Sequence, residues 1–568
     1  MGSELGITAD SKPQAAYTPV SIWWACWAGI WTAAVALGMT YLITRRNTPI
    51  LRIRGLGLSL SAVVLLHLYW ASVQFGTMIG AIMPGDAQYW IMGTYLPCGM
   101  ALFHASNSRF LHVAKLQRKY VHHDSDPSDA SPDPKRKGGL ISRFRSLNYN
   151  AKILVITGIS IVLQLLLTIL MWIISRKWHT SWGIPGTEVH GTPMEQNTEM
   201  GRGWEWWSTV VGQVFWSWIV APIILWKSRN IHDTHGWRVQ TIGCAIANLP
   251  ATPLWLIGLY VPAMEVVNQY WIPPQWICLS ILVMEIFTVF LPCWEAMRHQ
   301  SLRQETLDAI AQWEAKTKAT GSEAKSLSSV PTMVESMMSG WKSTNGSVET
   351  TNTFRDSILT MSALEYVLER NPTPLQTFSA LHDFSGENVA FLTSVAEWKS
   401  SMPMAAGDST TPKDDTAKEL IRERFIRALH IYATFISVRH AEFPVNISSQ
   451  DLKKLESIFE GPARILYGDE REVDLATPFD TPSFSFKAPS SPTSVEGFEK
   501  ATQSLVSPMN DQVQYLIEVP EAFGATVFDN AEESIKYLVL TNTWPKFVRS
   551  RRSSTDSSDT MKANMHAV

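Results

Sequence analysis

The stretch KILVITGISIVLQLLLTILMWII, residues 152–174, decides which kind of fold this chain can adopt. Its only charged residue is Lys152, at the very start, and isoleucine, leucine and valine make up most of the rest. A helix needs about 20 consecutive apolar residues to cross the roughly 30 Å hydrocarbon core of a bilayer. The stretch meets that length, so the sequence predicts a membrane-spanning helix here.

Six other stretches share this length and apolar character, which brings the predicted spans to seven. The spans cover residues 20–43, 56–78, 89–113, 152–174, 206–226, 239–262 and 271–294. Several carry tryptophan or tyrosine at their ends, where amphipathic rings favour the membrane–water interface. The third and sixth spans depart most from an uninterrupted apolar helix, because the third contains Asn107 and Arg109 and the sixth contains Pro250 and Pro253. We therefore predict an all-α fold in which residues 20–295 form a seven-helix transmembrane bundle.

The charges of the loops predict the side of the membrane that each loop faces. The first, third and fifth loops are rich in lysine and arginine, whereas the others carry mainly acids, apart from Arg176 and Lys177 beside the fourth span. Positively charged loops stay in the cytoplasm. Residues 1–19, which lack the pattern of a cleaved signal peptide, are then extracellular, and everything after about residue 295 is cytoplasmic. We expect a multi-pass protein of the plasma membrane, with the lipid bilayer as one partner.

Two ionisable side chains lie near the middle of predicted spans, His67 in the second and Glu285 in the seventh. An ionisable group at that depth is a candidate for function. We predict that both face a common bundle interior and line a cavity that senses a small-molecule ligand or a proton. The alternative is a buried structural hydrogen bond. A transporter with an appended regulatory domain is a third possibility, but the chain shows no internal repeat to support it.

Composition argues against several other classes of function. All five cysteines lie inside apolar segments and none forms a CxxC pair, so we predict no disulfide framework, no metal site and no cofactor. The net charge of −3 and the absence of a basic stripe argue against nucleic acid as a partner.

The part of the chain after residue 295 has the composition of a soluble, all-helical protein. Residues 296–353 combine a polar helical extension with a flexible linker, and residues 468–511 and 551–568 are predicted to be disordered. The spacing of apolar residues predicts helices over 361–370, 375–383, 385–398, 418–438, from 448 onward, and 529–540. Ser385 and Ser448 are expected to cap the helices that follow them.

Three blocks of this half follow one another in a characteristic order. They are LERNPTPLQTFSALHDFSGENVAFLTSVAEW (368–398), RFIRALHIYATFISVRHAEFPVNISSQDLKKLE (424–456) and VFDNAEESIKYLVLTNTWPKFVRS (527–550). They resemble the opening helices, the middle helix pair and the closing helix of RGS domains, the regulators of G-protein signalling. The resemblance covers 354–550 apart from the 468–511 insertion. Seven predicted spans ahead of it, with inner-face segments such as IHDTHGW and PCWEAMRHQ, resemble the seven-transmembrane RGS proteins of plants and filamentous fungi.

The resemblance implies which residues contact a heterotrimeric G-protein α subunit. Glu387 and Asn388 match the Glu-Asn pair that faces the first switch segment of the α subunit. Asn446 matches the asparagine beside its water-positioning glutamine, and Leu538 matches a contact leucine. Each also has an ordinary explanation: a first-turn pair favoured by the helix dipole, a turn asparagine, and a core leucine.

Three contact positions depart from the family pattern. Asn542 stands where an acidic residue is usual, Thr543 where serine is usual, and Lys546 where arginine is usual. An Asp–Arg pair makes a bidentate bond that Asn and Lys cannot reproduce, so the strength of activity or the choice of α subunit is in question.

The resemblance implies a regulator of an enzyme, not an enzyme, and no catalytic residue of its own. We expect a membrane-anchored GTPase-activating protein for the GTP-bound or transition-state form of the α subunit. The alternative is a seven-helix receptor or scaffold whose RGS-like domain binds the α subunit without accelerating hydrolysis, and Asn542 and Lys546 are the features that favour it.

Overall fold

The computed structural model describes residues 14–121, 144, 147, 149–179, 181–320, 334, 358–401, 415–468 and 519–551. The chain forms two compact units. The first unit holds the described residues up to Lys115 and those from 144 to Arg298. The second unit holds Leu116–Val121 and the described residues from His299 onward. Most of the predicted linker, the predicted insertion after 468 and the tail after 551 lie outside the described residues, as do residues 1–13 of the predicted N-terminal segment.

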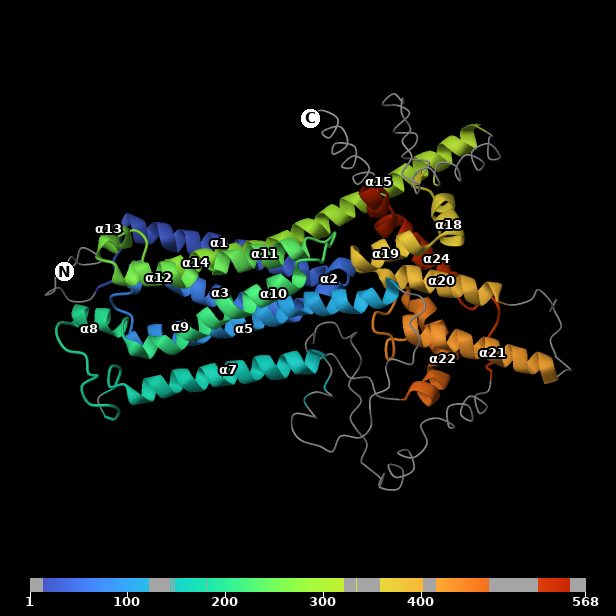
Figure 1. Cartoon of the computed structure of the whole chain (residues 1–568). Helices are drawn as coiled ribbons and strands as arrows, with labels where there is room; N and C mark the ends of the chain where they lie inside the picture. The colour runs from blue at the N-terminus through green and yellow to red at the C-terminus, as the bar shows by residue number, and fades with distance from the viewer. Residues whose placement is uncertain are drawn as a thin grey trace, which may run out of the picture. The chain divides into compact units, whose positions relative to one another are not determined.

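The first unit consists of long helical stretches joined by short helices and loops (Figure 1). The long stretches are α1 (Pro19–Thr44), α3 (Leu56–Gln74), α5 (Gly85–Gln117), α7 (Tyr149–Ile174), α9 (Trp207–Val214) with η4 (Phe215–Val220) and α10 (Ala221–Ser228), α11 (Trp237–Asn248) with α12 (Ala251–Tyr260), and α14 (Pro274–Glu285) with η6 (Ile286–Phe290) and α15 (Leu291–Thr320). The short helices are α2 (Pro49–Arg54), α4 (Gly76–Ile79), α8 (Pro193–Met200), η3 (Trp204–Trp206), η5 (Pro262–Met264) and α13 (Glu265–Asn268). The ends of α5 and α15 belong to the second unit.

Six helical stretches are long and apolar enough to cross a membrane. They are Pro19–Thr44, Leu56–Gln74, Ala151–Ile174, Glu195–Ser228, Trp237–Tyr260 and Pro274–Asp308. These correspond to six of the seven predicted spans. The third predicted span, 89–113, is helical within α5 but is not among the apolar six. Its polar residues, Asn107 and Arg109 among them, lower its apolar content, so a seventh crossing remains a proposal.

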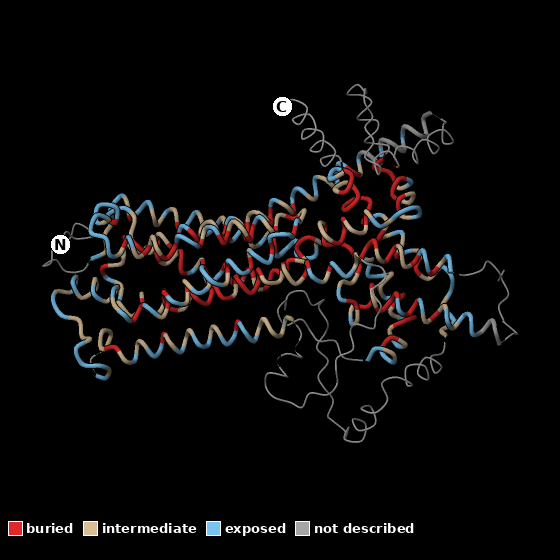
Figure 2. Tube along the Cα trace, in the orientation of Figure 1, coloured by how far each residue is buried: buried red, intermediate tan, exposed pale blue. Residues whose placement is uncertain are grey.

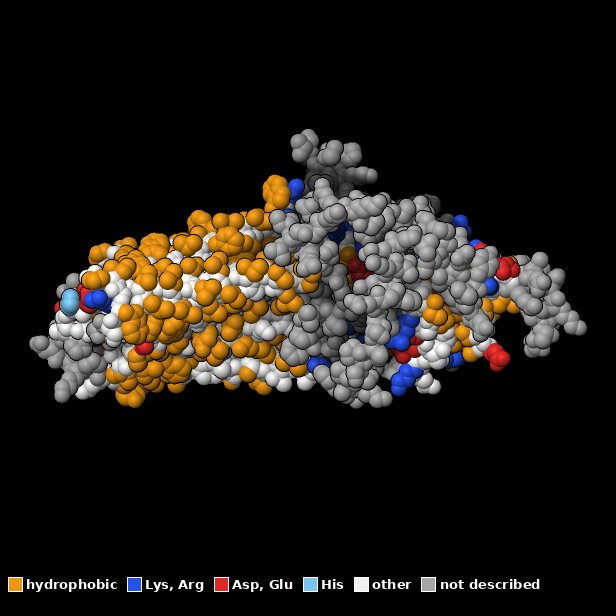
Figure 3. All heavy atoms as spheres, turned by 90° about the horizontal axis from the view of Figure 1, so that it is seen from below, with side chains coloured by type: hydrophobic (Ala, Val, Ile, Leu, Met, Phe, Trp, Pro, Cys, Tyr) orange, Lys and Arg blue, Asp and Glu red, His pale blue; other side chains and the backbone are white. Residues whose placement is uncertain are grey.

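The surface of α7 shows that the first unit is built for an apolar surrounding. Ile159, Leu163 and Leu166 have more than half of their surface exposed, at 64%, 56% and 58%. The polar Thr157 and Thr168 point inward and are buried, at 5% and 0%. Most of α7 is tan or pale blue in Figure 2, and hydrophobic side chains cover most of the visible side of the first unit in Figure 3. Apolar residues outside and polar residues inside suit lipid and not water, so this is an α-helical membrane protein.

Three helical stretches widen into a π-helix just before a proline. The pairs are η4 and Pro222, η6 and Pro292, and, in the second unit, η8 (Val539–Thr543) and Pro545. Proline has no N–H, and in an α-helix its ring clashes with the carbonyl four residues earlier. The wider π turn shifts that carbonyl, so each stretch continues as a helix through its proline.

The second unit is all-helical in its described residues, as predicted. Its helices are η1 (Arg118–Val121), α18 (Met361–Arg370), α19 (Thr373–Leu381), α20 (Gly386–Ser400), α21 (Asp415–Ile431) with η7 (Tyr432–Ile436), α22 (Ser449–Tyr467) and α24 (Asp529–Leu538) with η8. Phe459 of α22 lies at the centre of the core. Its ring stacks on those of Phe425, Tyr432 and Phe528, with centroids 5.5, 5.3 and 5.7 Å away.

Local details of this unit test the predicted helix ends. Ser448 caps α22, because its Oγ accepts from the backbone N–H of Asp451 at 3.1 Å. Ser385 precedes α20 but makes no capping bond, so that prediction is wrong. The last helix was expected to end at Leu540, yet helical backbone continues to residue 551 because the π-helix accommodates Pro545.

Candidate functional site

Asp383, in the turn between α19 and α20, joins two segments of the second unit that are far apart in the chain. Its carboxylate accepts hydrogen bonds from Thr543 Oγ1 at 2.8 Å and from Ser385 Oγ at 2.9 Å. Lys546 Nζ lies 2.7 Å from its other oxygen. Since the Asp383 side chain is fully buried, Lys546 is needed to offset its charge. The turn therefore holds η8 and the helix after it beside the start of α20.

The backbone of this turn is strained at Phe384. It has a φ of 48°, which places a bulky residue in the left-handed region. Its ring is 1% exposed, and the following Ser385 N–H donates to the carbonyl of Ser379 at 2.9 Å. Buried packing and this hydrogen bond hold a conformation that costs about 1–3 kcal/mol by itself. The result is that Asp383 and Ser385 both face Thr543.

The positions that depart from the RGS pattern take partners that the sequence did not suggest. Lys546 pairs with Asp383, so the acid comes from the α19–α20 turn and not from position 542. Asn542, a residue that is 7% exposed, accepts a hydrogen bond at its Oδ1 from Nε2 of His299 in α15. Thr543, which was expected to be a contact residue, is 1% exposed. Asp383 and His299 were missed because an acid in a turn and a histidine in a polar helix carry no local signal.

Glu387 and Asn388 lie side by side in the first turn of α20, and neither is freely exposed. Gln117, the last residue of α5, donates from Nε2 to Glu387 Oε2 at 2.9 Å. Its Oε1 accepts from the backbone N–H of Gly386 at 2.9 Å. The pKa of Tyr120 in η1 is raised by burial, and further by the nearby carboxylate of Glu387. Gln117 and η1 therefore pack against the start of α20.

Asn446 and Leu538 complete the set of matched residues. Asn446 is exposed, in the loop that links η7 to α22. This loop is tied back by the N–H of Val445, which donates to the carbonyl of Phe435 at 2.8 Å. Leu538 is partly buried and packs against the core of the second unit. Asn446 is thus the matched residue that is open to a partner.

His67 and Glu285 contact each other in the first unit, with Glu285 buried and His67 partly buried. Glu285 is 1% exposed, and its Oε1 lies 2.8 Å from His67 Nδ1. Its Oε2 accepts a hydrogen bond from Trp31 Nε1. His67 Nε2 lies 3.0 Å from Thr32 Oγ1, a hydroxyl that can donate to a neutral imidazole or accept from a charged one. The network links α1, α3 and α14 and accommodates either charge state of His67.

A cavity of about 190 Å³ lies elsewhere in the first unit. Its lining is mainly apolar and includes Trp206 and Trp255, and the polar or charged residues Gln88, Asn197 and Arg202 also line it. Neither His67 nor Glu285 is among the lining residues. The cavity and the pair of ionisable residues are therefore separate features.

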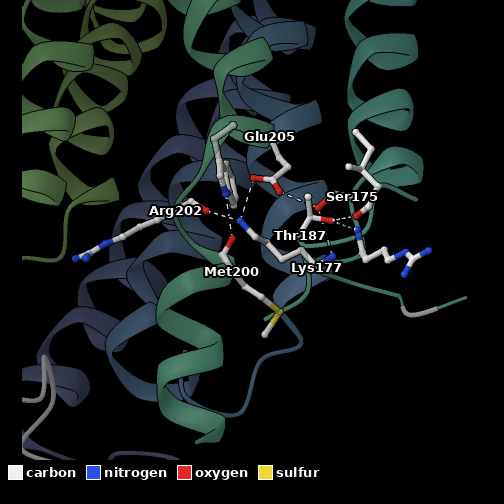
Figure 4. A network of polar contacts seen from close by, with 9 residues as sticks. Ser175, Lys177, Thr187, Met200, Arg202 and Glu205 are labelled. Atoms are coloured by element: carbon white, nitrogen blue, oxygen red, sulfur yellow. Dashed lines mark hydrogen bonds and ion pairs between the residues drawn. The ribbon is translucent and has the colours of Figure 1, made fainter. Parts of the chain in front are cut away.

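A second polar network surrounds Glu205, as Figure 4 shows. Glu205 is 1% exposed, lies 2.9 Å from Lys177 Nζ, and accepts from Ser175 Oγ at 2.8 Å. Arg176 pairs with Glu188 at 2.9 Å. The two basic residues that depart from the pattern of loop charges are thus each paired with an acid of the same loop.

The IHDTHGW segment contributes to a polar cluster around Arg54. Arg54 Nη1 donates to Gln240 Oε1 at 2.8 Å, and its guanidinium also donates to the carbonyl of His235. Burial lowers the pKa of Arg54 to about 10, although the charge of Asp233 raises it. Asp233 accepts from the backbone N–H of Trp237 at 2.7 Å, at the start of α11. The segment holds α2 against α11 with a guanidinium that stays charged at neutral pH.

The fold and these networks define an α-helical membrane protein with a second, all-helical unit. No protein-family model, no curated protein and no solved structure matches the chain.

Proposed function

We propose that this chain is a membrane-anchored regulator of G-protein signalling, whose second unit binds a heterotrimeric α subunit and accelerates its hydrolysis of GTP. The observation that carries the proposal is the meeting of segments at the Asp383 turn. The Oγ of Ser385, two residues before Glu387, lies 3.2 Å from Thr543 Oγ1 across about 160 residues of chain. Thr543 and Lys546, which the RGS resemblance assigns to the contact surface, are thus held beside the turn that precedes Glu387 and Asn388.

The proposed mechanism needs no reacting group from this chain. An α subunit hydrolyses GTP with its own arginine and glutamine, at about 10⁻² per second unaided. A partner that binds the switch segments best in their transition-state geometry raises this rate. Asn446 is exposed, and its amide can both donate and accept, which suits it to orient the glutamine of the α subunit.

The Lys546–Asp383 ion pair favours this proposal over the scaffold alternative. The scaffold was suggested because Asn542 and Lys546 cannot reproduce an Asp–Arg pair. Lys546 Nζ lies 2.7 Å from the buried carboxylate of Asp383. An acid–base ion pair is therefore present beside the proposed surface, although its acid comes from position 383 and not from position 542. The neutral Asn542 remains the feature that favours a scaffold.

For the first unit we propose seven crossings, with α5 as the third, in the plasma membrane. The loop charges support an extracellular N-terminus and a cytoplasmic second unit. A membrane anchor raises the effective concentration of the second unit near a lipid-anchored α subunit, so weak contacts suffice. The His67–Glu285 pair is our candidate for the group that senses a proton or small ligand, with a structural hydrogen bond as the alternative.

The test is single-turnover GTP hydrolysis by an α subunit in the presence of the full chain in lipid nanodiscs. Acceleration over the α subunit alone supports the proposal. Binding to the α subunit loaded with GDP and aluminium fluoride, without acceleration, would support the scaffold.

Asn446→Ala is expected to lower the accelerated rate by about tenfold to a hundredfold, because it removes one positioned hydrogen-bonding group from the transition state. The same single-turnover assay measures the change. Asn530→Ala is the matched control, since Asn530 is also an exposed asparagine of the second unit and should leave the rate unchanged. Equal rates for the two variants would contradict the role of Asn446.

A further inference from the structure

Gln117 docks onto the first residues of α20 through both ends of one amide. The amide oxygen accepts from Gly386 N–H, and the amide nitrogen donates to Glu387 Oε2, each at 2.9 Å. Gln117 is itself 0% exposed. Beside it, the carbonyl of Tyr120 accepts from Gln376 Nε2 at 2.6 Å. The segment Gln117–Val121 is thus held by specific hydrogen bonds.

This segment covers part of the surface proposed to bind the α subunit and leaves another part open. Glu387 and Asn388 are 9% and 5% exposed, whereas Asn446 is exposed. A protein partner cannot use the carboxylate of Glu387 while Gln117 covers it. In this arrangement the part of the proposed surface at Glu387 and Asn388 is buried, and the part at Asn446 is exposed.

The segment also reaches the loop that carries Asn446. The ring of Tyr120 lies 6.3 Å from that of Phe435, whose carbonyl anchors this loop. Lys119 Nζ lies 3.2 Å from Glu442. Both groups of that ion pair are well exposed, so it adds little to the hold of the segment. The two hydrogen bonds of Gln117 are therefore the main contacts that hold the segment against the start of α20.

Next to Glu387, the side chain of Asn388 lacks one hydrogen bond. Asn388 Oδ1 is buried and has no hydrogen-bond partner among the described residues. A buried acceptor without a donor is costly, and most native acceptors have one. The closed arrangement thus leaves an unmet acceptor at a position that the proposed function assigns to the α subunit.

We propose that Gln117–Val121 is an intramolecular competitor of the α subunit. Binding of Glu387 and Asn388 to the first switch segment requires Gln117 to leave Gly386 and Glu387. The incoming switch segment then supplies the donor that Asn388 Oδ1 lacks. This inference rests on the proposed function and adds the regulation of the same surface.

The same contacts allow the opposite role, in which Gln117 permanently stabilises the start of α20. If Gln117 braces the start of α20 in its binding geometry, loss of its side chain weakens α-subunit binding. If Gln117 competes, loss of its side chain strengthens binding. The sign of the change separates the two roles.

The experiment uses the full chain in lipid nanodiscs and measures the Kd for the α subunit loaded with GDP and aluminium fluoride. Gln117→Ala is expected to bind about tenfold tighter, because two hydrogen bonds no longer oppose opening. Lys119→Ala is the matched control in the same segment and should bind as the wild type does. Gln117→Glu places a carboxylate against Glu387 and should also tighten binding. Hydrogen exchange of the Gly386 amide should quicken in both Gln117 variants while that of α22 stays unchanged.

Asn446→Ala distinguishes failure of this inference from failure of the proposed function. If Gln117→Ala and Gln117→Glu bind no more tightly than the wild type while Asn446→Ala still weakens binding, the competitor is overturned and the proposed function stands. If no variant binds the α subunit, although exchange shows α22 intact, both are overturned.

Discussion

Asp383→Ala is expected to lower the free energy of unfolding of the second unit by about 3–5 kcal/mol. The substitution leaves the Lys546 ammonium, 15% exposed, without its acid. It also removes the acceptor of the Ser385 and Thr543 hydroxyls. A buried charge whose partner has been deleted is among the costliest defects in a protein interior. Hydrogen exchange of the α20 amides, which reports on opening of this unit, measures the loss.

Two further variants test the explanation. Glu423→Ala removes an acid from an exposed pair with Arg427 on α21, and is expected to cost less than about 1 kcal/mol. Asp383→Ala combined with Lys546→Met removes both charges and should recover part of the loss. If Asp383→Ala lowers the free energy of unfolding no more than Glu423→Ala does, the Asp383 carboxylate does not anchor the turn.

Helices with strong local signals could be predicted to the residue. The prediction for 361–370 coincides with α18, because Thr360 accepts from the N–H of Ala363 at one end and Asn371-Pro372 ends the helix at the other. The six apolar stretches were also predicted, although with different ends, since the length of an apolar run is a property of the sequence alone.

The third predicted span and the π-helices show what local patterns leave open. The polar Asn107 and His104 of α5 are each 3% exposed, because neighbouring helices and not lipid surround them. A helix in such a place does not need to be apolar. The spans 206–226 and 271–294 were predicted to continue through Pro222 and Pro292, but nothing in the apolar pattern indicated that the turn before each proline widens into a π-helix. Only at Pro545 was the helix expected to end, and there too the turn before the proline widens.

The candidate surface was only partly accessible from the sequence. Glu387, Asn388 and Asn446 could be named because the resemblance rests on motifs. The contacts of Asp383 with Thr543 and of Gln117 with Glu387 join residues about 160 and 270 positions apart. No periodicity or motif spacing encodes such contacts, since they depend on how the helices pack.

Glu285→Ala is expected to destabilise the first unit by about 3–5 kcal/mol, because it leaves the Trp31 N–H and the His67 Nδ1 without their acceptor in the bundle interior. Thermal unfolding of the full chain in detergent measures the change. Glu265→Ala is the matched control, since Glu265 is an exposed acid of the same unit. Destabilisation no greater than that of the control would show that the network contributes nothing to the fold.

Glu285→Gln then separates sensing from a structural role. Glutamine keeps the size of the side chain and one acceptor, so it should cost less stability than alanine, but it cannot carry the charge that pairs with a protonated His67. If the pair senses a proton, the rate of GTP hydrolysis in the presence of the wild-type chain varies with pH relative to the α subunit alone, and Glu285→Gln removes that dependence. If the variant loses stability yet keeps the same pH dependence, Glu285 and His67 form a structural hydrogen bond, and the sensing group lies elsewhere in the first unit.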